Sequence, residues 1–145
     1  MANPTNVLIV DDDRDHGAFL AEIVQDHGFA TKSVGSAEEA LAAFAEAPVE
    51  VVVTDVHMPG IDGVRLISML ANHASKPALI AITAFGSLNT AVRVLRAGAM
   101  DYLSKPFQPE EIVERIRQAV QRRTRQLEQQ KLHQEVEEVL RKRRT

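Results

Sequence analysis

Residues 51–55 have the sequence VVVTD and are followed by a Pro-Gly turn signal at 59–60. An unbroken apolar run of this length, ending at a turn, predicts a strand that is buried on both faces of a parallel sheet. Asp55 falls at the carboxyl end of that strand, where open α/β sheets place their ligand sites. Burying a carboxylate is costly unless a cation or hydrogen-bond donors compensate it, so we expect such partners near Asp55.

Further strand patterns accompany this segment, and helical patterns separate them. Strands are predicted over 7–10, 30–34, 49–55, 78–83 and 100–104. Helices are predicted around 19–24, over 36–47 with a Ser36–Glu39 capping box, over 63–73 and 87–97, and from 109 onwards. Their expected apolar positions include Phe19 in the first helix and Val92, Val94 and Leu95 in the fourth. The strict alternation indicates an α/β protein, a doubly wound parallel sheet with helices on both faces.

Composition limits the chemistry open to this chain. With 145 residues and 45% apolar content it can bury one ordinary core, and two domains would be cramped. The lack of cysteine excludes disulfides, thiolate metal sites and cysteine nucleophiles. The first six residues lack the pattern of a signal peptide, and no apolar run approaches membrane-spanning length. We therefore expect a cytoplasmic protein with no membrane partner.

The net charge of −3 conceals two parts of opposite sign. Residues 1–107 contain 7 Lys/Arg and 13 Asp/Glu, a balance of −6, whereas residues 108–145 contain 10 and 7, a balance of +3. The acidic part is therefore the candidate for cation binding, and the basic part has the pattern of a helical tail.

Polar groups follow four of the predicted strands: Asp11 and Asp12 after the first, Asp55 after the third, Thr83 after the fourth and Lys105 after the fifth. The carboxyl ends of parallel strands share one edge of a sheet, so these groups can converge. Oxygen ligands alone suit a hard divalent ion such as Mg²⁺. An ammonium and a hydroxyl suit phosphoryl oxygens, and a carboxylate can itself be the nucleophile in phosphoryl transfer. The set predicts a Mg²⁺-assisted phosphoryl-acceptor site.

Four motifs, in this order and at family spacing, resemble the receiver domain of bacterial two-component response regulators: VDDD at 10–13, DVHMPGIDG at 55–63, ITA at 82–84 and DYLSKPF at 101–107. The resemblance covers roughly residues 5–122 and is strongest to nitrogen-regulator and nodulation-regulator receivers. It implies a flavodoxin-like strand order 2-1-3-4-5 and a receiver domain over 1–122. Residues 123–145 would then form a helical extension or linker, for which a coiled coil is one option.

The resemblance also implies a role for each residue of the site. Asp55 would accept a phosphoryl group from a partner histidine kinase. Asp12, Asp55 and the backbone carbonyl of His57 would ligate Mg²⁺ directly, and Asp11 would hold it mostly through water. Lys105 would bind a phosphoryl oxygen. Such a protein catalyses only its own phosphorylation and dephosphorylation, so it is not expected to be an enzyme.

The same resemblance implies a switch. Thr83 would bond the phosphate and Tyr102 would move inward, remodelling a face made by the fourth helix, fifth strand and fifth helix. A partner or a second copy of the chain would bind there. His57 and Phe85 would flank the path of the hydrolytic water and modulate the phosphate's lifetime. The Lys105–Pro106 peptide would be cis. Asp101 is interpreted only as a polar strand residue, and His16 and the other isolated histidines receive no role.

Residues 110–140 contain neither proline nor glycine, which predicts one long helix continuing past the domain. An apolar stripe of Ile112, Val113, Ile116 and Val120 would pack on the sheet. Val113, Val120 and Leu127 follow a seven-residue spacing, but the second apolar position of the heptad is occupied by Arg123 and Gln130. A dimerising coiled coil and a solvated helix therefore both remain open. The basic residues at 141–144 lack a recognition helix. Nucleic acid is expected to be contacted only through an output domain that lies outside this chain.

Three alternative functions are disfavoured. A haloacid-dehalogenase-like phosphatase needs an acid two residues after its nucleophile, and His57 stands there. A docking module without phosphorylation would be expected to lack an acid, the threonine or the lysine, and none is missing. A flavin-binding protein of this topology needs a Ser/Thr/Gly-rich phosphate loop after the first strand, where this chain has three acids.

Overall fold

The computed structural model describes residues 4–84 and 88–144, which form one five-stranded parallel sheet flanked by helices. The strands are β1 (Asn6–Val10), β2 (Ala30–Val34), β3 (Val51–Asp55), β4 (Ala78–Thr83) and β5 (Asp101–Ser104). The helices are α1 (Arg14–Asp26), α2 (Ala37–Glu46), α3 (Gly63–Ala71), α4 (Leu88–Ala97) and α5 (Pro109–Arg144). The strand order β2-β1-β3-β4-β5 and the long last helix confirm the predicted fold class.

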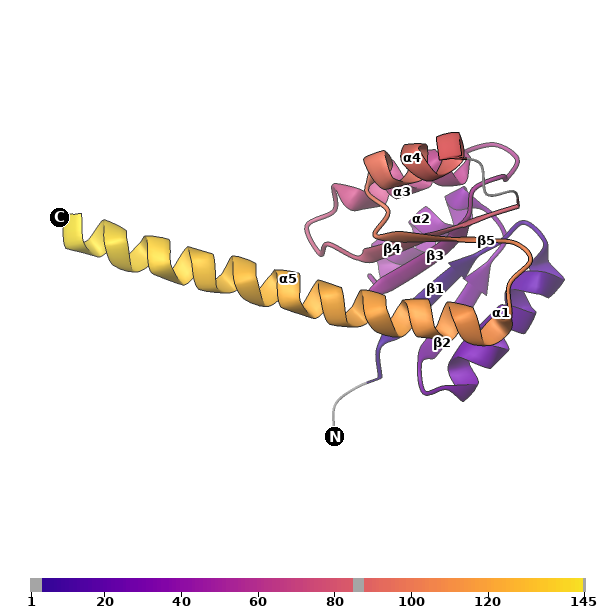
Figure 1. The fold of residues 1–145 in the computed structure, drawn as a ribbon, viewed down its shortest axis with the longest axis horizontal. Coiled ribbons are helices and arrows are strands. Elements are labelled where there is room, and N and C mark those ends of the chain that lie inside the picture. Colours follow the sequence, from indigo (N-terminus) through magenta and orange to yellow (C-terminus); the bar gives the residue numbers. More distant parts are fainter. Residues whose placement is uncertain (1–3, 85–87, 145) are drawn as a thin grey trace.

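Helices cover both faces of the sheet (Figure 1), α1 and α5 on one side and α2, α3 and α4 on the other. Successive side chains of a strand point to opposite faces. In β1, Val7 and Ile9 therefore pack toward α1 and α5, whereas Leu8 and Val10 pack toward α2, α3 and α4. Two buried faces require apolar residues at every position, which explains the continuous apolar runs in the sequence.

The central strand β3 pairs with β1 on one side and with β4 on the other. All five of its residues are buried. It begins at Val51, two residues later than predicted, because Val49 and Glu50 belong to the connection that enters the sheet. Val49 nevertheless packs against the core. This placement leaves Asp55 as the last residue of a central strand that is buried along its whole length.

Side chains at the helix starts hold the loops that surround the carboxyl edge of the sheet. Asp13 caps α1, Ser36 caps α2 and Asp62 caps α3, each by accepting a backbone N–H three residues later. The predicted Ser36–Glu39 pair is present, because Ser36 Oγ accepts from Glu39 N–H at 3.1 Å. The Glu39 carboxylate, however, reaches back to the N–H of Gly35 at 2.8 Å.

The apolar positions predicted for α4 are partly wrong. Val94 is buried together with Ala91, but Val92 and Leu95 are 36% and 45% exposed. Ala91 and Val94 are three residues apart and form the buried side of the helix, so Val92 and Leu95 lie on its outward side. Phe19 on α1 is likewise 54% exposed. The predicted start of this helix at residue 87 lies outside the described residues.

The last helix, α5, runs for 36 residues and has two distinct parts. Its first turns pack on the sheet through Ile112, Val113 and Ile116, with Val120 partly buried at the edge, as the sequence predicted. The later part projects away from the sheet (Figure 1), and four of its apolar side chains are exposed. These are Leu132, Val136, Val139 and Leu140. Within the described ranges, no helix is long and apolar enough to cross a membrane.

Two arginines join these parts of α5 to the rest of the domain. Arg122 donates to the carbonyl of Met100 at 3.0 Å. Arg123 donates through Nε to the carbonyl of Lys76 at 2.9 Å and through Nη2 to that of Ser75 at 2.8 Å. The helix is therefore fastened to the loop between α3 and β4, which leads into the sheet from the edge opposite the acidic residues.

Candidate functional site

Three carboxylates meet at the carboxyl edge of the sheet. Asp11 and Asp12 directly follow β1, and Asp55 ends the neighbouring strand β3. One oxygen from each lies within 4.8 Å of the others. Asp11 and Asp55 are buried, at 2% and 6% exposure, whereas Asp12 is exposed. An oxygen-only group of this kind, open on one side, has the chemistry to hold a hard divalent cation.

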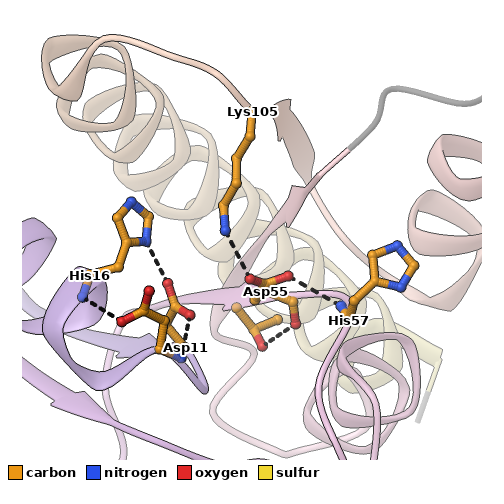
Figure 2. A network of polar contacts seen from close by, with 7 residues as sticks. Asp11, His16, Asp55, His57 and Lys105 are labelled. Atoms are coloured by element: carbon orange, nitrogen blue, oxygen red, sulfur yellow. Dashed lines mark hydrogen bonds and ion pairs between the residues drawn. The ribbon is translucent and has the colours of Figure 1, made fainter.

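Asp55 has two compensating partners (Figure 2). Its Oδ2 forms an ion pair with Lys105 Nζ at 3.1 Å. Its Oδ1 accepts the backbone N–H of His57 at 3.1 Å. Lys105 is positioned by its own N–H, which donates to the carbonyl of Thr83 at 2.8 Å, and the Lys105–Pro106 peptide is cis, as the resemblance implied. The partners expected for a buried carboxylate are thus an ammonium from the fifth strand's end and an amide from its own loop.

The loop after β3 is held close to the strand by Gly63, the first residue of α3. Its N–H donates to the carbonyl of Val56 at 2.9 Å. A Cβ at this position would lie 2.1 Å from the carbonyl oxygen of Asp55, so only glycine fits without movement. The side chain of His57 is exposed and its ring points away from Asp55, while its N–H points toward it (Figure 2). Phe85, the other position assigned to phosphate lifetime, lies outside the described residues.

Asp11 is held by the start of α1. Its Oδ1 accepts the N–H of Asp13 at 3.0 Å, and its Oδ2 lies 2.6 Å from Nδ1 of His16. The sequence interpretation gave His16 no role, so this contact was missed. The spacing of five residues across a helix cap has no periodic signature that could have indicated it.

Thr83 and Tyr102 lie on neighbouring strands at the same edge. Thr83 is buried, and its Oγ1 is 3.5 Å from Oγ of Ser104, its register partner on β5. Tyr102 is partly buried against the core beneath α2, α3 and α4. Asp101 has more than the simple polar role that was predicted, because its Oδ2 pairs with Nη1 of Arg115 on α5 at 2.8 Å.

Beside the acidic pocket formed by Asp11, Asp12 and Asp55, an ion pair joins the start of α1 to the start of α2. Arg14 binds the carboxylate of Glu39, which also accepts the N–H of Gly35. The hydrogen bond from Arg14 is the main cause that holds the pKa of Glu39 below its ordinary value. The same bond raises the pKa of Arg14. Both side chains are exposed, so this pair organises the loop more than it stabilises the fold.

Fold and pocket together define a flavodoxin-like α/β module whose carboxyl edge carries a buried acceptor-type carboxylate, two further acids and one ammonium. Comparison with known proteins shows to which family of this class the chain belongs. The family model "Response regulator receiver domain" matches residues 7–117. The chain belongs to the receiver domain family of two-component response regulators, signalling switches in which phosphorylation of an aspartate is general. Receivers of this family generally bind Mg²⁺ at an acidic cluster and are phosphorylated by histidine kinases.

Individual relatives support the same family assignment. The chain is 34% identical over 128 residues to the regulatory protein AtoC of Escherichia coli, covering 88% of this chain and 28% of AtoC. Among solved structures, NtrX from Brucella abortus superposes with a TM-score of 0.84 at 27% identity, over 90% of this chain and 30% of NtrX. The receiver domain of the Francisella response regulator 1452 superposes with a TM-score of 0.76 at 29% identity, over 81% and 98%. The chain thus spans less than a third of the length of AtoC and of NtrX.

Proposed function

We propose that this receiver accepts its phosphoryl group on Asp55, with Mg²⁺ held in the pocket, and that the modification switches a protein-binding face. The observation that carries the proposal is the position of Asp55. It is the buried acid at the end of the central strand, and its carboxylate forms an ion pair with Lys105. One of its oxygens also lies within 4.8 Å of an oxygen from each of two further carboxylates. These are the groups that a transferring phosphoryl group requires.

In the proposed transfer, a carboxylate oxygen of Asp55 attacks the phosphorus of a phosphohistidine on a sensor kinase. The P–O bond forms as the P–N bond breaks, and the released imidazole takes up a proton. Lys105 binds a phosphoryl oxygen and stabilises its charge. Asp11, Asp12, Asp55 and the carbonyl of His57 would hold Mg²⁺, which offsets the charge of the phosphoryl group.

The switch would begin at Thr83. Its present hydrogen bond to Ser104 is long, at 3.5 Å, so a phosphoryl oxygen on Asp55 can compete for the hydroxyl. Tyr102, partly buried on the adjacent strand, would then turn inward and remodel the face formed by α4, β5 and α5. A population shift of this kind requires contacts that favour one state, and Thr83 and Lys105 supply them. His57 and Phe85 would set how long the phosphate lasts.

The proposed partners are a sensor histidine kinase and a second copy of this chain. Dimerisation would use the α4–β5–α5 face, the projecting part of α5, or both, because Val92, Leu95 and the four exposed apolar residues of the tail are available there. Residues 1–122 would form the receiver and 123–145 an extension that carries the signal to an output module. The protein would act in the cytoplasm, catalysing only its own phosphorylation and dephosphorylation.

Intact-mass spectrometry after treatment with acetyl phosphate and Mg²⁺ tests the acceptor. Phosphorylation adds about 80 Da to the wild type, and we expect no gain in Asp55→Asn. Asp62→Asn is the matched control, because it changes an acid of the same loop while asparagine still caps α3. We expect it to be phosphorylated like the wild type. A Mg²⁺-dependent gain that persists in Asp55→Asn would refute the assignment, and no gain in any protein would favour a docking module.

Light scattering on the same samples tests the dimer. A chain ending at Gln126 retains both arginine contacts of α5 but lacks the exposed apolar residues of the tail. If the tail mediates dimerisation, the full chain is a dimer and the shortened chain a monomer. If the α4–β5–α5 face does so, both dimerise on phosphorylation. Two monomers under all conditions would refute both interfaces.

A further inference from the structure

Among the residues that the structure describes, His16 is the one histidine whose ring forms a hydrogen bond with an acid of this group. It lies in the first turn of α1, and Figure 2 shows its ring directed toward Asp11. The distance of 2.6 Å between His16 Nδ1 and Asp11 Oδ2 is that of a short, charge-assisted hydrogen bond. An ionised carboxylate can only accept, so Nδ1 is the donor in this contact.

The ring of His16 is fixed from a second side. The ring of Phe107 meets it edge-on, with 6.5 Å between centroids. Phe107 lies two residues after Lys105, whose ammonium binds Asp55. The side chain of His16 is therefore only about one-third exposed, at 32%. One side chain thus spans the segment that follows β1 and the segment that follows β5, on either side of the acceptor strand.

Asp11 is held almost completely by this first turn of α1. Asp13 N–H occupies one carboxylate oxygen and His16 Nδ1 the other. The backbone of Gly17 packs so closely that a Cβ there would lie 3.3 Å from Cβ of Asp11. The rotation of the Asp11 carboxylate is thereby fixed, and with it the direction in which its remaining lone pairs face the pocket.

His16 does not belong to the ligand group itself. The atoms that lie within 4.8 Å of one another come from Asp11, Asp12 and Asp55 alone, among the described residues. Its position is that of a group behind a ligand, and such hydrogen bonds orient ligands and tune the metal affinity of a site. A histidine donating to a carboxylate at this distance is therefore suited to orienting Asp11.

We propose that His16 is a positioning residue of the pocket: its Nδ1–H holds the Asp11 carboxylate in the orientation that receives a divalent cation. This inference rests on the proposed function, since it assumes that the three acids hold Mg²⁺. Its consequence is a site whose cation affinity depends on α1 and, through Phe107, on the segment that carries Lys105.

Isothermal titration of the metal-free protein with MgCl₂, at one fixed pH and ionic strength, tests the proposal without phosphorylation. His16→Leu keeps an apolar body against Phe107 but removes the donor. His16→Asn is the conservative variant, because its amide nitrogen is as many bonds from Cα as Nδ1. We expect the Kd for Mg²⁺ to rise about tenfold in His16→Leu and to stay within about threefold of the wild type in His16→Asn.

Asp11→Asn separates the two levels of the proposal. A weakened Asp11→Asn together with an unchanged His16→Leu would overturn the role of His16 and leave the metal site standing. An unchanged Asp11→Asn would show that the pocket does not use Asp11 for Mg²⁺ at all. Equal weakening in His16→Leu and His16→Asn would mean that the ring contributes packing only.

A second measurement does not depend on the variants being folded. Long-range ¹H–¹⁵N spectra of the wild-type protein identify which imidazole nitrogen of His16 carries the proton. We expect a proton on Nδ1 both before and after saturation with MgCl₂. A bare Nδ1 in the Mg²⁺-bound protein would overturn the proposal.

Discussion

Gly63→Ala places a methyl group where the structure has no room for it. The new Cβ would lie 2.1 Å from the carbonyl oxygen of Asp55 and 2.7 Å from Cα of Val56, and real Cβ atoms essentially never approach within 3.0 Å. The start of α3 must therefore move by at least about 0.9 Å away from the end of β3. Both obstacles are backbone atoms of the central strand's end, so they cannot yield by changing rotamer.

The cost follows from that displacement. Forcing an extra carbon into a packed region costs about 1–3 kcal/mol, and a contact with fixed backbone belongs at the upper end. Alanine regains up to about 1 kcal/mol through its better helix propensity. We therefore expect Gly63→Ala to lower the free energy of unfolding by about 2 kcal/mol, measured by urea denaturation monitored by circular dichroism. The N–H of His57 should also shift in ¹H–¹⁵N spectra, because its loop moves away from Asp55.

Gly17→Ala is the matched control. Gly17 is also a buried glycine in the first turns of a helix, but a Cβ there would be 3.3 Å from Asp11 Cβ, so a movement of a few tenths of an ångström suffices. Its better helix propensity should offset the crowding, and we expect a change within about 1 kcal/mol. The reasoning would be refuted if Gly63→Ala were as stable as Gly17→Ala.

Three further changes give distinct outcomes. Lys105→Met leaves the buried Asp55 carboxylate without its ammonium, so we expect the free energy of unfolding in metal-free buffer to fall by about 1–2 kcal/mol. Saturating Mg²⁺ should then stabilise this variant more than the wild type, and equal stabilisation of the two proteins would contradict this expectation. The hydrogen bond from Arg14 lowers the pKa of Glu39 below its ordinary value of 4.5. The stabilisation that this pair contributes is therefore present when the pH is above that ordinary pKa, and it is lost as the pH falls through the lower pKa of the folded state. Because both side chains are exposed, we expect only a slightly smaller fall of the urea midpoint with pH in Glu39→Gln across that acid range, and an unaltered pH profile would exclude the linkage. Arg123→Ala removes two hydrogen bonds to loop carbonyls, so we expect the free energy of unfolding to fall by about 1 kcal/mol. Amide hydrogens of the loop between α3 and β4 should also exchange faster, and unchanged protection there would count against a role of Arg123 in holding this loop.

The sheet and the convergence of the acids could be predicted from the sequence because they depend on periodicity and topology alone. A continuous apolar run that ends at Asp55, and another that ends at Asp11, determine which residues stand at strand ends. Parallel pairing then brings those ends to one edge, whatever the side-chain conformations. The same logic located Thr83 and Lys105, and the strand register places Thr83 opposite Ser104.

Contacts that depend on rotamers or on helix rotation could not be predicted in this way. His16 reaches Asp11 across the cap of α1, and nothing in the sequence distinguishes this histidine from an exposed one. The pairing of Asp101 with Arg115 joins residues whose proximity depends on how α5 is rotated on the sheet. For α4, an apolar pattern identified a helix but did not show that Ala91 and Val94, rather than Val92 and Leu95, form its buried side.

The fastening of α5 by Arg123 has a mechanical consequence. The 21 residues of α5 from 124 to 144 form a rod about 30 Å long, at 1.5 Å per residue. With its root clamped to the loop between α3 and β4, a tilt of about 10° at Arg123 carries the far end through about 5 Å, nearly the pitch of one helical turn. A small tilt at the root of the rod thus becomes, at its tip, a displacement large enough to change which residues of the rod face a neighbour.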